Sequence, residues 1–93
     1  PHVFSLSQNY PNPFNPITKI KYGLPKKSHV EIVIYNTLGQ KVRTLISDNQ
    51  SAGYYLVTWE GTDDKGRPVP SGIYIYRMTA DNFKETKKLV LLK

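Results

Sequence analysis

Apolar and polar residues alternate along most of this chain, in short runs that stop at glycine, proline or asparagine. The alternation has a period of two, which is typical of half-buried strands, and a helical period of 3.6 residues is nearly absent. The pattern predicts seven strands, at residues 3–7, 17–24, 29–36, 41–47, 54–60, 73–80 and 83–93.

Seven strands at short and regular spacing predict an all-β fold, an Ig-like Greek-key β-sandwich of about seven antiparallel strands. The whole chain, 1–93, is expected to form one domain, because 93 residues leave no room for a second core. Residues 1–16 would form an opening strand and a proline-rich loop, and residues 17–93 the sandwich with its terminal strand. Since the first residue is Pro1 and not Met, we expect the chain to be excised from a larger secreted protein.

The turns and one aromatic residue give this sandwich its expected framework. Gly39 lies in the turn 37–40, where a hairpin requires a positive φ, and Gly53 and Gly72 precede strands. Trp59 shares a strand face with Tyr55 and Val57, so we expect it to lie at the centre of the core.

No set of residues in the sequence has a spacing typical of catalysis. Neither His2 nor His29 has a serine or thiol at a recognisable spacing, and the six glycines are dispersed rather than gathered in a phosphate-binding loop. Asp63 and Asp64 lack the alternating oxygen ligands of a calcium loop, so a turn is the better interpretation. We therefore expect a non-catalytic protein with no cofactor and no metal.

Charge and aromatic content leave one binding function open. Thirteen basic residues against seven acidic ones give a net charge of +6, but the charge is scattered, which argues against nucleic acid as a partner. Contact with polyanions, including acidic polysaccharide or lipid headgroups, stays open. The seven tyrosines would line the core or, as an alternative, form a platform for sugars.

Five motifs occur in order along the chain: Asn9-Tyr10-Pro11-Asn12-Pro13-Phe14-Asn15-Pro16; Ile34-Tyr35-Asn36 with Gly39-Gln40; Ala52-Gly53 with Tyr55, Val57 and Trp59; Pro70-Ser71-Gly72-Ile73-Tyr74-Ile75-Tyr76-Arg77; and Lys87 to Lys93. This series resembles the type A C-terminal sorting domain of the type IX (Por) secretion system of Bacteroidetes-like bacteria. It is also similar to the Ig-like domain of the flagellar hook-capping protein. Glu60 departs from the aspartate that often follows the tryptophan in such domains.

The resemblance implies a module that directs an upstream cargo domain through an outer-membrane translocon, by way of the periplasm, to the cell surface or the medium. A sortase-like peptidase often removes such a module after export. The sorting signal would be Lys87, Lys88, Leu89, Val90, Leu91, Leu92 and Lys93. The structural motif would comprise Pro11, Asn12, Pro13, Phe14, Asn15, Pro16, Gly39, Gly53, Trp59 and Gly72.

The terminal strand would be recognised by strand addition at an exposed edge, with its four consecutive apolar side chains presented to the translocon. The simpler alternative is that residues 83–93 are only the last core strand. Two other functions stay open for the whole module: a carbohydrate- or surface-binding accessory module of an extracellular enzyme, and an assembly domain like that of the hook cap.

Overall fold

The computed structural model describes all 93 residues and consists of strands, turns and loops. Its seven strands are β1 (Ser5–Leu6), β2 (Thr18–Leu24), β3 (Ser28–Tyr35), β4 (Lys41–Gln50), β5 (Gly53–Trp59), β6 (Gly72–Ala80) and β7 (Phe83–Leu91). The largest difference from the predicted bounds is at the end of β4, which continues from Ser47 to Gln50 because it stays paired with the start of β3. The structure has no helix that could cross a membrane.

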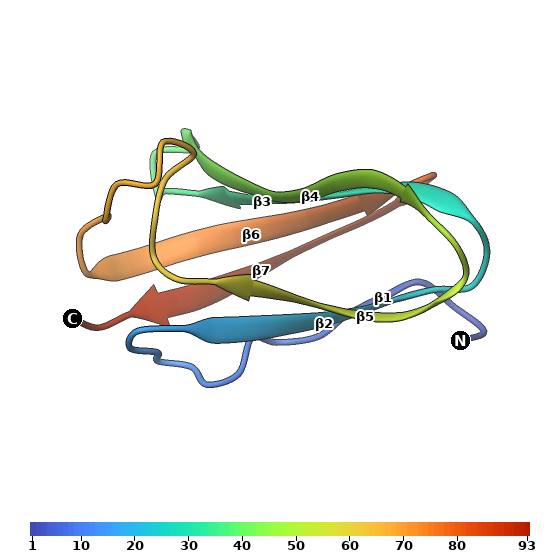
Figure 1. Cartoon of the computed structure of the whole chain (residues 1–93), viewed down its shortest axis with the longest axis horizontal. Coiled ribbons are helices and arrows are strands. Elements are labelled where there is room, and N and C mark those ends of the chain that lie inside the picture. The colour runs from blue at the N-terminus through green and yellow to red at the C-terminus, as the bar shows by residue number, and fades with distance from the viewer.

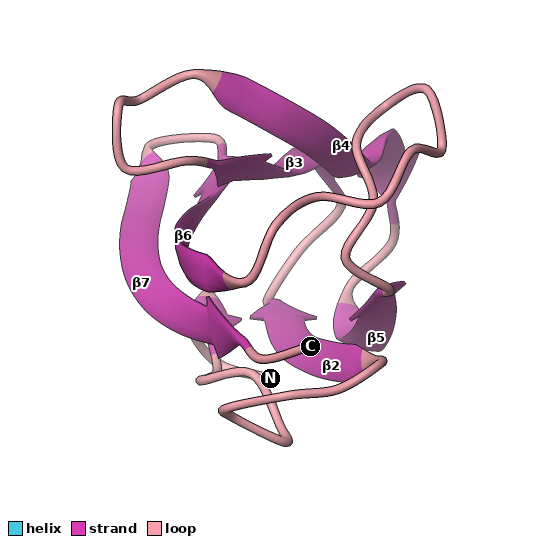
Figure 2. Cartoon of the chain, turned by 90° about the vertical axis from the view of Figure 1, so that its left-hand side faces the viewer, coloured by secondary structure: helices cyan, strands magenta, loops and turns pink.

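The strands form two antiparallel sheets that face each other, with strand order β1-β2-β5 in one and β4-β3-β6-β7 in the other. Figure 1 shows the two sheets as layers along the long axis of the molecule, and Figure 2 shows them from the end that holds the C-terminus. The termini lie at opposite ends of the long axis (Figure 1). The prediction of an all-β Ig-like sandwich is confirmed.

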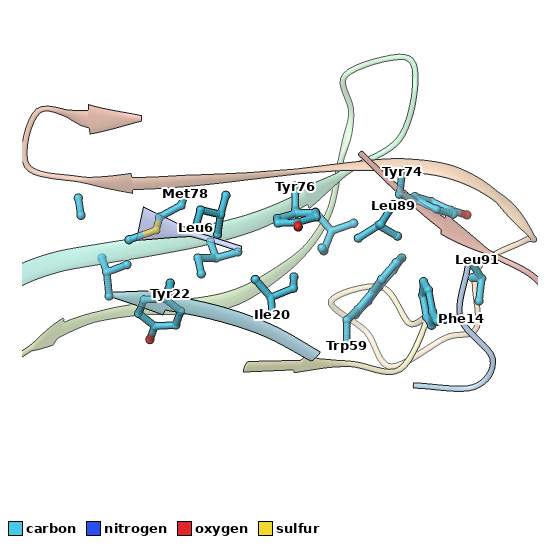
Figure 3. Close-up of a cluster of buried hydrophobic side chains, with 14 of the residues drawn as sticks. Leu6, Phe14, Ile20, Tyr22, Trp59, Tyr74, Tyr76, Met78, Leu89 and Leu91 are labelled. Carbon is cyan, nitrogen blue, oxygen red and sulfur yellow. The ribbon is translucent and has the colours of Figure 1, made fainter. Parts of the chain in front are cut away.

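Alternation within the strands builds the core between the two layers. In β3 every second residue, namely Val30, Ile32 and Ile34, has no exposed surface. In β6 the same holds for Tyr76 and Met78, so the tyrosines of this strand line the core. Figure 3 shows Tyr76 and Met78 on one side of the core and Ile20 and Tyr22 of the other sheet on the opposite side.

Strand β4 does not keep the alternation that its sequence predicts. Its pairing with β3 shifts register at two places, between Ile32 and Val33 and between Ile34 and Tyr35. A register shift of one residue turns the following side chains to the other face. Alternation along residues 41–47 would put Val42 and Leu45 on opposite faces, but both pack against the core.

Trp59 is buried as predicted, but it lies toward one end of the core, beside Phe14 and near Leu91, and not at its centre (Figure 3). It is 1% exposed, and its ring centroid lies 5.5 Å from that of Phe14 and 5.2 Å from that of Tyr74. Its indole N–H donates to the Thr62 carbonyl at 2.8 Å, so the polar atom of this buried side chain is satisfied. Trp59 therefore joins both sheets and the proline-rich loop.

The β3–β4 turn depends on one glycine and one asparagine. Gly39 has a φ of 81°, a region that side chains with a Cβ rarely occupy. The Asn36 side-chain oxygen accepts from the backbone N–H groups of Leu38 and Gln40, each at 3.0 Å. The turn is thus held by local hydrogen bonds, as is typical of asparagine in turns.

Candidate functional site

The predicted sorting signal divides between the two faces of its sheet. Leu89 and Leu91 are 0% and 2% exposed and point into the core (Figure 3). Val90 points the other way, and Leu92, two residues further on, is 52% exposed. The expectation that all four apolar side chains are presented outward is therefore wrong, because a strand turns alternate side chains to opposite faces.

The backbone edge of the same segment is also occupied. The proline-rich segment, residues 8–16, which we call the strap, runs along β7 and forms three hydrogen bonds with it and a fourth with Leu92, which follows the strand. The Gln8 side chain donates to the Lys88 carbonyl at 2.7 Å, and the Asn12 side chain accepts from the Val90 N–H at 3.0 Å. The Phe14 backbone donates to the Val90 carbonyl and accepts from the Leu92 N–H, each at 3.0 Å. The expected exposed edge is thus closed from residue 88 to residue 92.

The strap is held from its other side by a network of buried hydrogen bonds. Asn9, which is 2% exposed, donates from its side chain to the Thr18 hydroxyl at 3.0 Å and from its backbone to the Tyr76 hydroxyl at 2.9 Å. The Tyr76 hydroxyl in turn donates to the Ser7 carbonyl at 2.7 Å. Burial raises the pKa of Tyr76 to about 12. Because Phe14 is also buried in the core, the strap is part of the fold rather than a loose cover.

The side chains that remain outside at this end of the sheet form an apolar surface. Val90 pairs with Ile73 across β7 and β6, and Ile75 pairs with Tyr35 across β6 and β3. These four residues and the exposed Leu92, which follows β7, make up what we call the outer-face patch: Tyr35, Ile73, Ile75, Val90 and Leu92.

Basic side chains border the outer-face patch. Lys88 is the pairing partner of Ile75, and the Arg77 guanidinium lies 5.5 Å from the centroid of the Tyr35 ring. The patch is therefore an apolar area with positive charge beside it, which is a surface that a partner protein with apolar and acidic side chains could bind.

Sequence reasoning found Val90 and Leu92 but missed Ile73, Ile75 and Tyr35. The run Ile73-Tyr74-Ile75-Tyr76 has large apolar residues in both registers, and this is the signal that both faces of β6 are apolar. Sequence reasoning also missed the contacts of Gln8 and Asn9, since their partners Lys88 and Tyr76 are distant in the sequence.

The other residues of the predicted structural motif lie at loops and strand ends. Pro11, Pro13, Asn15 and Pro16 are exposed on the strap, beside the Asn12 and Phe14 contacts. Gly53 and Gly72 each begin a strand, β5 and β6. These residues shape the path of the chain around the core and bring no reactive group to the outer-face patch.

Strand pairing places a serine beside a histidine, which the sequence spacing did not reveal. The Ser47 hydroxyl lies 3.5 Å from His29 Nε2 across β3 and β4, and it donates to the Glu31 carboxylate at 3.0 Å. All three side chains are exposed, and the hydroxyl proton is engaged by a carboxylate rather than by the imidazole. The arrangement is a surface hydrogen-bond cluster and lacks the buried base that activates a nucleophile.

The acidic loop has the geometry of a turn. Asp63 Oδ1 accepts from the backbone N–H groups of Lys65 and Arg67, each at 2.9 Å. These hydrogen bonds, the one from Arg67 first, lower the pKa of Asp63. Asp64 accepts from the Thr44 N–H at 2.9 Å. Both carboxylates are used by backbone donors, and no group of three or more acidic, histidine or cysteine side chains is arranged to hold a metal.

Comparison with known proteins identifies the family. The model of the FlgD Ig-like domain matches residues 15–84, and the chain belongs to this family. A search of curated proteins gave no match. Among solved structures, FlgD from P. aeruginosa has a TM-score of 0.62 and 27% identity over 80% of this chain. The resemblance to the hook-capping Ig-like domain is thereby confirmed.

Two further solved structures share the fold. Dimeric latent PorU from Porphyromonas gingivalis has a TM-score of 0.76 at 16% identity, and PorZ, a surface component of the type IX secretion system of the same organism, has 0.61 at 15%. Each covers 97% of this chain. The chain spans 9% of PorU, 11% of PorZ and 58% of FlgD, less than two thirds of each.

Proposed function

We propose that this Ig-like domain is a non-catalytic sorting and attachment module that directs an upstream cargo through the type IX secretion system to the cell surface or the medium. The observation that carries the proposal is the outer-face patch, in which Val90 and Leu92 of the predicted signal lie on the surface of a fold shared with PorU and PorZ. The translocon, and a sortase-like peptidase after export, would be its partners.

The closed edge of β7 bears on how such a module is recognised. Strand addition needs free backbone groups, and the strap occupies those of residues 88–92. The part of β7 without strap contacts, residues 83–87, contains only Lys87 of the predicted signal, so strand addition there would not read its apolar residues. We therefore replace our earlier mechanism: the folded domain would be recognised through side chains of the outer-face patch.

An assembly domain like that of the hook cap is the second candidate. It is favoured by the family match at residues 15–84 and by the 27% identity with FlgD. An assembly domain would act through contacts between subunits, whereas a sorting module would act on any cargo fused to it. The two functions therefore differ in whether the domain can be transferred.

The test is whether this domain directs the export of an unrelated protein to which it is fused. The 93-residue chain is fused behind a fluorescent reporter with a Sec leader and expressed in a bacterium with a working type IX system and in a strain that lacks its translocon. We expect the reporter in the medium or at the surface of the first strain and in the periplasm of the second. Periplasmic retention of a folded fusion in both strains would contradict the sorting function and leave the assembly domain.

A further inference from the structure

The outer face of the other sheet, β1-β2-β5, carries exposed aromatic and basic side chains that the sorting function does not use. Tyr54 and Leu56 on β5 are 61% and 64% exposed, and they pair with Gly23 and Lys21 on β2. On the other side of β2, Tyr10 pairs with Lys19 and is 81% exposed. Paired residues point to the same face of a sheet, so these side chains share one surface. We call Tyr10, Lys19, Lys21, Tyr54 and Leu56 the tyrosine–lysine face.

The ring of Tyr54 is positioned by its neighbours on β2. A Cβ atom at Gly23 would lie 2.7 Å from Ser5 Oγ and 3.1 Å from Cε1 of this ring, so both side chains lie against the bare backbone of the glycine. Gly23 has no positive φ and stands within a strand, where glycine is otherwise unfavourable, and this close approach accounts for it. The Lys21 ammonium lies 4.7 Å from the ring centroid, and Lys21, Tyr54, Tyr55 and Leu56 line a shallow hollow.

Within the three strands the charge of this surface has one sign, and the exposed Glu60 follows directly after β5. The residues of β1, β2 and β5 that point outward include Lys19 and Lys21 and no acidic residue. The two lysines occupy adjacent outward positions on β2, with Tyr10 beside one end of the pair and Tyr54 beyond the other. Lys19 and Gly23 are four residues apart, so the tyrosines are separated by about 13 Å along the strand direction. This is an extended strip with aromatic rings at both ends and positive charge between them.

We propose that the tyrosine–lysine face binds an acidic polysaccharide. The apolar C–H face of a sugar ring stacks on an aromatic ring, and a carboxylate or sulfate group on the sugar pairs with an ammonium group. Exposed ion pairs are individually weak, so the ligand is a polymer that engages several of these side chains together. This binding function is independent of the sorting function, because it uses the opposite face of the sandwich.

The test is affinity electrophoresis of the 93-residue chain through gels that contain polygalacturonate, alginate or heparin, with neutral dextran as a reference. We expect retardation by at least one acidic polymer and none by dextran. Tyr54→Ala should weaken binding by about fivefold through loss of the stacking surface, whereas Tyr54→Phe retains it. Lys21→Gln should weaken binding, while Lys84→Gln, an equal change of charge on β7, should not.

Several results would overturn the proposal. One is the absence of retardation by every acidic polysaccharide. A second is retardation that is the same for Tyr54→Ala and the original chain. A third is an equal loss of retardation in Lys84→Gln and Lys21→Gln. Either of these two results would mean that the chain binds through its net charge alone. Competition by polyglutamate as strong as by the polysaccharide would assign the face to an acidic polypeptide instead. Circular dichroism of each variant checks the fold, which exposed positions such as Tyr54 should not disturb.

Discussion

Trp59 connects the strap to both sheets, since it lies on β5 and contacts Phe14 of the strap and Tyr74 of the opposite sheet. We expect Trp59→Ala to lower the free energy of unfolding by about 3–5 kcal/mol, because the cavity would lie in a closed core. Denaturant unfolding monitored by circular dichroism measures the change. Leu38→Ala, at a residue 82% exposed in the β3–β4 turn, is the control and should change little. A loss below about 1 kcal/mol for Trp59→Ala would contradict this role.

Tyr76 makes stability sensitive to alkaline pH. Its pKa is raised from an ordinary 10.0 to about 12, so the folded state holds the phenol proton more tightly than the unfolded state does. The stabilising effect is complete below pH 10 and is lost as the pH rises from there through about 12. We expect the unfolding free energy to fall over this range.

Absorbance titration of the phenolates and denaturant unfolding between pH 9 and 12 test this expectation. In Tyr76→Phe the late-titrating phenol should be missing and the fall in stability with pH should be shallower. Burial also raises the pKa of Tyr22 and Tyr74, so part of the slope should remain. Equal slopes for the variant and the original chain would contradict the assignment to Tyr76.

At the scale of elements, the strap and β7 depend on each other. The Asn12 side chain accepts the outward N–H of Val90, whereas Asn15, also exposed on the strap, makes no such contact. We expect Asn12→Ala to speed hydrogen exchange of the Val90 amide and to cost about 1 kcal/mol of stability. Asn15→Ala should do neither. Exchange measured by NMR that is equally slow in both variants would show that Asn12 does not close the edge.

The same pair of elements shows how far the sequence could be interpreted. Alternation predicted β7 itself, with an error of two residues at its end. The closed edge could not be predicted, because Asn12 and Val90 are 78 positions apart and their contact depends on the whole sandwich. The two register shifts in β4 were missed for a similar reason, since only the pairing with β3 reveals them.

At the scale of the molecule, the family and the fold follow from the ordered motifs, whereas the function does not follow from the fold. Sequence reasoning assigned the signal to Lys87–Lys93 as a continuous segment. The structure divides that segment: Leu89 and Leu91 belong to the core, and Val90 and Leu92 belong to the outer-face patch. Deleting residues 87–93 would therefore remove core residues and unfold the domain, so a truncation cannot separate signalling from folding.

Surface substitutions can separate signalling from folding. One such comparison tests most directly whether the domain is recognised through the outer-face patch. The double variant Val90→Ser, Leu92→Ser removes the apolar side chains of the signal from the outer-face patch and keeps Leu89 and Leu91. Each variant is fused to the exported reporter and its amount in the medium and at the cell surface is measured, with thermal unfolding as the check of fold. The control is Leu38→Ser, because the Leu38 side chain is 82% exposed and lies outside the patch. We predict that the folded double variant stays in the periplasm while the control is exported. Export of the folded double variant at the level of the control would contradict recognition through the outer-face patch.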